Sequence, residues 1–246
     1  IPGVRDGSMT AATVALGLMA KPPRPGLAKT RLAAGIGPEA AAAFARAFLL
    51  DTARVLEAAA TTGSLACSVL FRPDDAANEL AALLARDWPL IPCDRGDLGA
   101  TMWWALSDRL AHHPAGAMIM GTDLPLVPPG VLVEAAAILR RGGPLDVVVM
   151  PTVDGGYGLI GVTSQAAAPL FAPQAWSTPA VLDETPRRAA AGGLTIHLLP
   201  EQRDIDEVDD LVWLRQALAA APDAAPATRA ALADFDRDRP RPGSTR

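Results

Sequence analysis

The stretch "LMAKPPRPGLAKTRL" at residues 18–32 carries the densest set of potentially reactive side chains in this sequence. Lys21, Lys29 and Arg31 flank Gly26, and three prolines stiffen the chain between the two lysines. Lysine binds phosphate as a point charge and arginine as a fork of donors, while glycine lets backbone approach a ligand. The stretch matches neither the Walker A pattern nor the dinucleotide-binding glycine pattern. It is a candidate phosphate-binding loop; the alternative is a stiff turn with solvated cations.

Three aspartates lie at the points where apolar runs give way to polar sequence. Asp123 in "GTDLP" directly follows an apolar run, and Asp204 and Asp206 in "RDIDEVDDL" precede a helical stretch. Mg²⁺ is commonly held by one or two carboxylates together with substrate phosphates. Acidic residues also cap helices and favour their N-termini, which is the alternative for all three. The metal hypothesis requires the fold to bring these clusters together.

Two successive glycines, Gly155 and Gly156, separate Asp154 from Tyr157 in "VDGGYGLIGV". Such a pair is typical of a tight turn with positive φ. The functional interpretation is that a ligand lies against the glycine backbone while Asp154 points into the site. The local sequence is compatible with both.

The segment "AWSTPAVLDET" places Trp176, Ser177 and Thr178 before an expected helix. Thr178 followed by proline fits the start of a helix, where proline is well tolerated. Trp176 is expected to pack in the core, with stacking on a sugar as the alternative. No cysteine or histidine in the sequence has the partners of a nucleophilic triad.

Apolar runs alternate with stretches of helical periodicity along the chain. This alternation predicts a three-layer α/β/α sandwich with helices on both faces of one sheet. Two late strands joined by "PTVDGG" predict a close antiparallel pair, so we expect a mostly parallel mixed sheet. The ligands of such sheets lie beyond the carboxyl ends of the strands, where the polar clusters fall. The expected strands include 13–20, 65–71, 117–121, 146–150 and 157–162, and the expected helices include 38–60, 75–86, 98–111, 129–141 and a helix with an acidic approach within 204–218.

No repeat and no linker divides the chain, so we expect a single domain over residues 10–220. Residues 1–9 end in "GSM", with Met9 as its last residue, and are interpreted as a leader derived from cloning. Residues 221–246 are interpreted as a C-terminal extension with a charged, proline-rich and disordered end.

Composition excludes several classes of partner. The net charge is −5 and the isoelectric point is near 5.2, whereas nucleic-acid binding needs a basic face. No apolar run is long enough to span a membrane, and the N-terminus lacks the order of a secretory signal. Two cysteines do not form a disulfide framework. We therefore expect a cytoplasmic protein without nucleic-acid or membrane partners, and leave its oligomeric state open.

Six short motifs follow one another along the chain. They are "MAKPPRPGLAKTRL", "GDLGATM", "GTDLPLVPPGVL", "PTVDGGYGLIGV", "FAPQAWSTPAVLDET" and "RDIDEVDDL". In this order they resemble the bacterial DUF2064 transferases, also called the radical-SAM/selenodomain-associated transferase 1 family, some of which are labelled arsenosugar-biosynthesis glycosyltransferases. The resemblance covers about residues 13–220 and implies a GT-A, nucleotide-diphospho-sugar transferase fold. At greater distance the sequence is similar to 2-phospho-lactate guanylyltransferase and molybdenum-cofactor guanylyltransferase.

The resemblance also implies roles for single residues. The nucleotide and phosphate side would comprise Lys21, Gly26, Lys29, Arg31 and Gly99. The metal would be held by Asp123 with Asp206 or Asp204. The acceptor side would comprise Asp154, Gly155, Gly156 and Tyr157, with Trp176 and Ser177 beside them. The residues assigned to catalysis would be Asp123, Lys29 and Asp154.

The sequence departs from the family pattern at two positions. Thr101 stands where the family motif "LGxRM" has arginine, and Gly158 stands where "DGGYY" has its second tyrosine. Because of these two changes, the acceptor and the activity of the family do not carry over directly to this sequence.

The leading hypothesis is a Mg²⁺- or Mn²⁺-dependent transferase of a nucleotide-activated substrate. Its preferred form is glycosyl transfer from a nucleotide sugar to a small-molecule acceptor, with the metal neutralising the diphosphate leaving group. The alternative enzyme is a guanylyltransferase-like nucleotidyltransferase that releases pyrophosphate from a nucleoside triphosphate. The alternative from another class is a non-catalytic nucleotide-binding protein.

Overall fold

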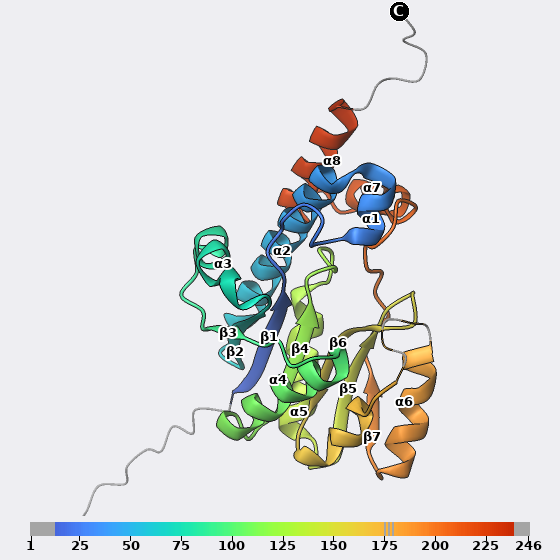
Figure 1. Ribbon diagram of the computed structural model, residues 1–246. Helices are drawn as coiled ribbons and strands as arrows, with labels where there is room; N and C mark the ends of the chain where they lie inside the picture. The colour runs from blue at the N-terminus through green and yellow to red at the C-terminus, as the bar shows by residue number, and fades with distance from the viewer. Residues whose placement is uncertain (1–12, 175, 177, 179, 239–246) are drawn as a thin grey trace, which may run out of the picture.

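The computed structural model describes residues 13–174, 176, 178 and 180–238. Within these residues the chain forms a seven-stranded sheet in the order β3-β2-β1-β4-β6-β5-β7, with helices on both faces (Figure 1). The β6 strand runs antiparallel to β4 and β5, and the other pairs are parallel. The expected mostly parallel mixed α/β/α sandwich is confirmed. The strands are β1 Val14–Ala20, β2 Leu65–Phe71, β3 Leu90–Pro92, β4 Ala117–Gly121, β5 Asp146–Pro151, β6 Tyr157–Val162 and β7 Thr195–Leu198.

The helices begin where the sequence supplies start signals. Pro38 opens the long α2 with Glu39 in its first turn, where neither a missing N–H nor a negative charge is unfavourable. At α4 the side chain of Asp97 accepts a hydrogen bond from the Ala100 N–H at 2.8 Å. The helices are α1 Thr30–Ile36, α2 Pro38–Ala60, α3 Ala77–Leu84, α4 Leu98–His112, α5 Pro129–Arg141, α6 Ala180–Ala191, α7 Asp210–Ala220 and α8 Pro226–Asp238, with 3₁₀ turns η1 Asp74–Ala76 and η2 Gln165–Phe171.

The core has three parts. One face of the sheet packs against α2, α3 and α5 through residues such as Leu56 and Leu132. The opposite face packs against α4, η2 and α6, where Leu106 and Phe171 are buried. A third cluster joins α1, α2, α7 and α8 beyond one end of the sheet (Figure 1). Strands with apolar side chains on both faces are therefore fully covered, as in other three-layer proteins.

The C-terminal helix α8 is packed onto α2. The Phe44 and Phe235 rings lie 5.6 Å apart in an edge-on contact, and the buried Asp51 carboxylate accepts the N–H groups of Ala227 and Thr228 at 3.1 and 2.6 Å. A carboxylate at this position satisfies N–H groups that the first turn of a helix leaves without partners.

The structure defines two helix boundaries more closely than the sequence does. The chain over 204–209 is a loop, and α7 begins only at Asp210, whose side chain accepts N–H groups from that loop. The expected helix over 75–86 is a 3₁₀ turn followed by α3. No helix among the residues described is long and apolar enough to cross a membrane.

Candidate functional site

The candidate site lies at the carboxyl ends of the strands, between the sheet and helices α1 and α7 (Figure 1). Its centre is the Lys29 ammonium, which lies 2.8 Å from Asp123 Oδ2 and 2.6 Å from Asp206 Oδ1. The Lys29 side chain is only 5 % exposed. Burial alone would lower its pKa, but the two carboxylates outweigh this effect and raise it above the ordinary lysine value. The ammonium also lies over the Phe48 ring, 5.6 Å from its centroid.

Backbone geometry aims Lys29 into the site. The residue precedes α1 and adopts a left-handed conformation, with φ 52° and ψ 48°, which is uncommon for a side chain other than glycine. The Lys29 side chain does not cap the helix and points instead to the two carboxylates. Strain of this kind persists where the surroundings define the conformation strongly, and it is frequent at functional sites.

Asp123 connects the end of β4 to the loop before α7. Its carbonyl accepts the Ile205 N–H at 3.1 Å, and its carboxylate accepts the Thr122 hydroxyl at 3.2 Å. The two acidic clusters found in the sequence are therefore adjacent in space, joined by a backbone hydrogen bond and by Lys29.

A second group of carboxylates lies beside this ion-pair network. Oxygen atoms of Asp154, Asp204 and Asp206 lie within 4.8 Å of one another and could hold a metal ion. Asp154 comes from the β5–β6 connection, where its Oδ1 accepts the Thr152 hydroxyl at 2.6 Å and the Gly156 N–H at 3.0 Å. Such carboxylate oxygens are the ligands preferred by Mg²⁺ and Mn²⁺. The chemistry of this donor set fits a divalent cation.

The pKa values of Asp204 and Asp206 are shifted in opposite directions. Burial, followed by the negative charges of Asp154 and Asp206, raises the pKa of Asp204 to about 7. Burial acts in the same direction on Asp206, but the Lys29 ammonium and the Arg31 guanidinium lower its pKa below the ordinary value. A neutral Asp204 beside a charged Asp206 reduces the repulsion within the acidic group, and a bound cation would favour charge on both.

The structure groups the carboxylates differently from the metal site expected from the sequence. Asp204 and Asp206 belong to the three-carboxylate group, together with Asp154, which the sequence placed on the acceptor side. Asp123 is not part of that group, and its Oδ2 faces Lys29. Asp206 is shared between the ion-pair network and the acidic group.

Asp210 is a site residue that the motifs did not indicate. One of its carboxylate oxygens accepts the N–H groups of Asp206 and Glu207 at 3.0 and 2.9 Å, and the other accepts Arg203 Nη1 at 2.9 Å. The Arg203 guanidinium also lies over the Trp213 ring. The only signal in the sequence was an aspartate in the first turn of a helix, which is too common to be diagnostic.

These residues enclose a cavity of about 240 Å³, lined by Arg31, Val153, Asp154, Arg203, Asp204, Asp206, Glu207 and Asp210. Arg31 forms an ion pair with Asp206, and its Nη1 lies 3.7 Å from Glu207 Oε1. A larger groove of about 790 Å³ lies between α2 and α8. Because alanine and phenylalanine form most of its lining, we place the chemistry in the smaller, charged cavity.

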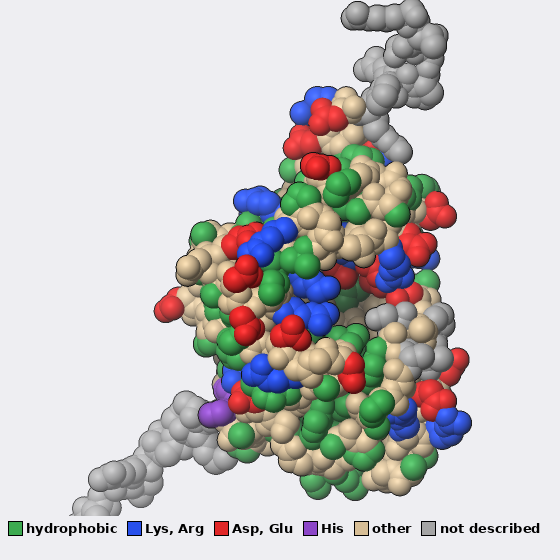
Figure 2. All heavy atoms as spheres, in the orientation of Figure 1, with side chains coloured by type: hydrophobic (Ala, Val, Ile, Leu, Met, Phe, Trp, Pro, Cys, Tyr) green, Lys and Arg blue, Asp and Glu red, His purple; other side chains and the backbone are tan. Residues whose placement is uncertain are grey.

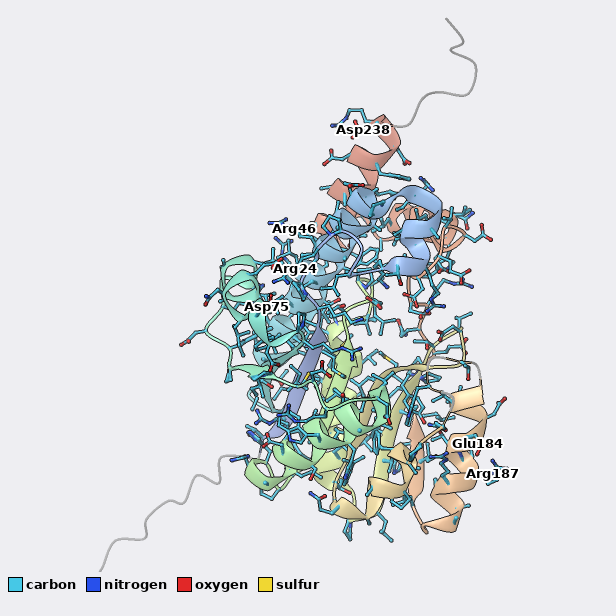
Figure 3. All side chains as sticks on the ribbon, in the orientation of Figure 1. Arg24, Arg46, Asp75, Glu184, Arg187 and Asp238 are labelled. Carbon is cyan, nitrogen blue, oxygen red and sulfur yellow. The ribbon has the colours of Figure 1, made fainter. Side chains whose placement is uncertain are left out.

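The cations of the loop over residues 21–29 point in different directions. Arg24 turns away from the site and pairs with Glu79 at 2.8 Å and Asp75 at 3.3 Å (Figure 3). Gly26 is exposed with φ 78°, a conformation that favours glycine. Lys21 lies at the end of β1 and forms no ion pair within the described part of the chain.

Two of the residues expected on the acceptor side contact helix α6. The Tyr157 hydroxyl is hydrogen-bonded to Thr185 of α6, and burial raises its pKa. Gly155 lies in the turn with φ 84°, and its carbonyl accepts the Leu182 N–H at 3.1 Å. Gly156 donates its N–H to Asp154.

Trp176 packs directly on Gly99, where a Cβ would lie 2.5 Å from the indole ring. Gly99 therefore provides room for the Trp176 ring, a packing role that does not require a nucleotide. Ser177 lies outside the described residues. The variant position Gly158 faces the core, where a Cβ would lie 2.6 Å from Leu124 Cδ1 and 2.8 Å from Met150 Cε. This environment leaves no room for the second tyrosine of the family motif.

The fold is that of the nucleotide-diphospho-sugar transferases. A structure from Desulfovibrio desulfuricans G20 described as such a transferase superposes with a TM-score of 0.81 and 25 % identity, covering 91 % of this chain and 95 % of the other. Glucosyl-3-phosphoglycerate synthase from Mycobacterium tuberculosis, solved with Mn²⁺, UDP and glucosyl-3-phosphoglycerate, superposes with a TM-score of 0.52 at 15 % identity. That match covers 89 % of this chain and 83 % of the synthase.

The sequence pattern of DUF2064, described as an uncharacterized protein family conserved in bacteria, matches residues 55–178, and the chain belongs to this family. A curated relative is phosphoenolpyruvate guanylyltransferase from Roseiflexus castenholzii, 33 % identical over 124 residues. That match covers 49 % of this chain and 52 % of the relative, so it spans about half the length of each protein.

Proposed function

We propose that this protein is a metal-dependent transferase that acts on a nucleotide-activated substrate. The observation that carries the proposal is the sharing of Asp206 between two groups of opposite character. On one side Lys29 and Arg31 contact it, and on the other Asp154 and Asp204 approach it. Fixed cations beside a cluster of carboxylates suit a phosphate chain that is bound together with a divalent cation.

Asp154, Asp204 and Asp206 would hold the cation, which is Mg²⁺ or Mn²⁺ in this proposal. When bound, the cation would supply charge neutralisation for the phosphate oxygens of the leaving group. The Mn²⁺ and UDP present in the glucosyl-3-phosphoglycerate synthase structure support this choice, although the similarity is at the level of fold. Asp123 would keep Lys29 in place at the junction of the two groups.

Residues of this chain would do the remaining work. The Lys29 ammonium is held rigidly by two carboxylates and a ring, so it adds positive charge without reorganising. Arg31 is half-exposed and can move from Asp206 to a phosphate, because its planar fork suits either anion. Asp154 is exposed at the rim and is the carboxylate best placed to take a proton from an acceptor hydroxyl.

The favoured reaction is glycosyl transfer. In it the bond from the sugar carbon to the diphosphate breaks, the acceptor oxygen forms the new bond, and a nucleoside diphosphate leaves. The opening loop supports this choice over nucleotidyl transfer. The N–H groups of Arg24, Leu27 and Ala28 are donated to carbonyls within the loop, so they are not directed outward to cradle a triphosphate.

The second candidate reaction is nucleotidyl transfer, favoured by one specific observation. The curated relative that shares 33 % identity with half of this chain is a guanylyltransferase. In this reaction the acceptor attacks the α-phosphate of a nucleoside triphosphate, and pyrophosphate leaves.

Product analysis separates the candidates. The protein is incubated with Mg²⁺ or Mn²⁺ and a panel of nucleotide sugars and nucleoside triphosphates, with small phosphorylated and hydroxylated acceptors. Nucleoside diphosphate released from a nucleotide sugar supports glycosyl transfer, and pyrophosphate released from a triphosphate supports nucleotidyl transfer. Asp206→Asn should abolish either product, while Glu39→Gln in the first turn of α2 should not. If no nucleotide raises the melting temperature of the wild type in the presence of metal, the proposed function is wrong; binding without turnover would indicate a non-catalytic nucleotide-binding protein.

A further inference from the structure

Three consecutive strand ends place Lys21, Arg72 and Cys93 in a row along the edge of the sheet. In the β1–β2 register Ala20 pairs with Phe71, and in the β2–β3 register Phe71 pairs with Pro92. The row is therefore formed by the next residue of each strand. The Arg72 N–H is donated to the Ala20 carbonyl at 3.3 Å, and the Cys93 N–H to the Phe71 carbonyl at 2.9 Å.

The side chains of Lys21, Arg72 and Cys93 lie on the same face of the sheet, because side chains alternate between the faces along each strand. Ala20 and Phe71 are buried on the α2 face of the sheet, whereas Cys93 is buried on the α4 face. Because successive side chains point to opposite faces, Lys21 and Arg72 are directed to the same side as Cys93. The two cations thus neighbour each other on the β2 side of Asp123, away from the acidic group.

Lys21 and Arg72 differ from the other cations at this edge. Within the described residues neither forms an ion pair, and the Arg72 side chain has no hydrogen-bond partner. Four neighbouring cations pair with carboxylates: Arg24 with Glu79, Lys29 with Asp123 and Asp206, Arg31 with Asp206, and Arg203 with Asp210. Arg95 instead lies over the Trp104 ring and donates to the Asp94 carbonyl. Lys and Arg side chains gather beside the hollow at the centre of the face drawn in Figure 2.

Two like charges held next to each other are unfavourable without an anion. Partial burial, and then the Arg72 guanidinium, lower the pKa of Lys21, and Asp123 opposes this effect. Burial raises the pKa of Cys93 to about 11; the Arg72 and Arg95 guanidinium groups oppose this effect, and the Asp94 and Asp74 carboxylates add to it. Asp123 forms its ion pair with Lys29, through Oδ2 at 2.8 Å. An arrangement of this kind is relieved by a ligand with negative charge.

We propose that Lys21 and Arg72 form an anion subsite for a phosphoryl group of the nucleotide substrate. The subsite deepens the proposed function and rests on it for the identity of the ligand. A guanidinium offers paired donors that match phosphate oxygens, and the lysine adds a point charge. With Lys21 and Arg72 on one side of Asp123 and the carboxylate group on the other, one end of a phosphate chain would meet the two side-chain cations, and the other end would meet the divalent cation held by the carboxylates. Arg72 is the residue that no motif of the sequence indicated.

The test compares Arg72→Gln with Arg46→Gln, which removes the same charge from α2, away from the sheet edge (Figure 3). Isothermal titration is carried out without metal, using inorganic pyrophosphate, UDP, GDP, uridine, guanosine and malonate. Arg72→Gln should weaken the binding of pyrophosphate and both diphosphates by about tenfold or more, as expected for the loss of a charged hydrogen bond. Binding of the nucleosides should be unchanged in both variants. Lys21→Gln should reproduce the effect, and circular dichroism confirms folding of each variant.

Several outcomes would overturn the subsite. It is wrong if the wild type binds no pyrophosphate or diphosphate, or if Arg72→Gln binds them as tightly as Arg46→Gln does. A loss confined to malonate would reassign the pair to a carboxylate. The proposed function is judged separately by the products and by Mn²⁺ binding, which Arg72→Gln should leave unchanged. Arg72-dependent binding without product contradicts the transferase alone, and product with Arg72-independent binding contradicts the subsite alone.

Discussion

Lys29 Nζ lies 2.6 Å from Asp206 Oδ1, although 177 residues separate the two in the sequence. This contact connects the loop after the first strand with the loop before α7, and Asp123 joins it from the end of β4. The ammonium lies between two carboxylates and offsets one of their two negative charges, while Arg31 also pairs with Asp206. It therefore has a structural role whether or not a nucleotide is bound.

Lys29→Met should destabilise the metal-free protein. Removing one partner of a buried ion pair leaves uncompensated charge and typically costs about 3–5 kcal/mol. Urea unfolding in the presence of a chelator measures this loss. Arg46→Met is the control, because Arg46 is exposed on α2 and should change the free energy of unfolding by less than about 0.5 kcal/mol. Equal losses in the two variants would contradict a central role for Lys29.

The raised pKa of Asp204 predicts a specific pH dependence of stability. The folded protein keeps this proton up to about pH 7, whereas the unfolded chain releases it near 3.8. Between these values the native state binds more protons, so the contribution of Asp204 to the free energy of unfolding falls as pH rises. Without metal, Asp204→Asn should gain stability relative to wild type from about pH 4 to pH 7, with no further gain above. A pH-independent difference in urea unfolding would show that Asp204 titrates normally, and the exposed Asp209→Asn serves as the control.

Asp210→Ala should weaken metal binding without removing a proposed ligand. Its carboxylate fixes the backbone of Asp206 and Glu207, and partners of this kind typically contribute 10–100-fold, roughly, to metal affinity. Mn²⁺ titration followed by electron paramagnetic resonance measures the change. Asp209→Ala is the matched control, since its side chain forms no cap with the same helix. Indistinguishable affinities would show that Asp210 does not position the acidic group.

Gly158→Ala should destabilise the protein by about 1–3 kcal/mol, the usual cost of overpacking a core. The added methyl group would lie against Leu124 and Met150, which must both move. Gly130→Ala is the comparison, because a Cβ there meets nothing within 4 Å. Thermal unfolding of both variants tests the expectation, and equal melting temperatures would contradict it.

Particular residues show how far sequence reasoning reached. The apolar run at β1 and the alanine-rich repeat of α2 were expected because their periodicity is local. The acidic approach to α7 was expected, but not the Asp210 side chain that holds 204–209 as a loop, because helical propensity does not report such hydrogen bonds. Arg72 was missed because its environment depends on the register of three strands.

The order of strands and helices, the mixed sheet and the position of polar clusters after strand ends could all be predicted from the amino-acid sequence. Each depends on periodicity, turn residues and charge within a short window. The charge contacts could not: Lys29 between Asp123 and Asp206, Asp154 beside Asp204, and Arg24 turned toward Glu79. These contacts join residues that strand order and loop closure bring together, and the free energy of an ion pair depends on burial and distance, which no local pattern contains.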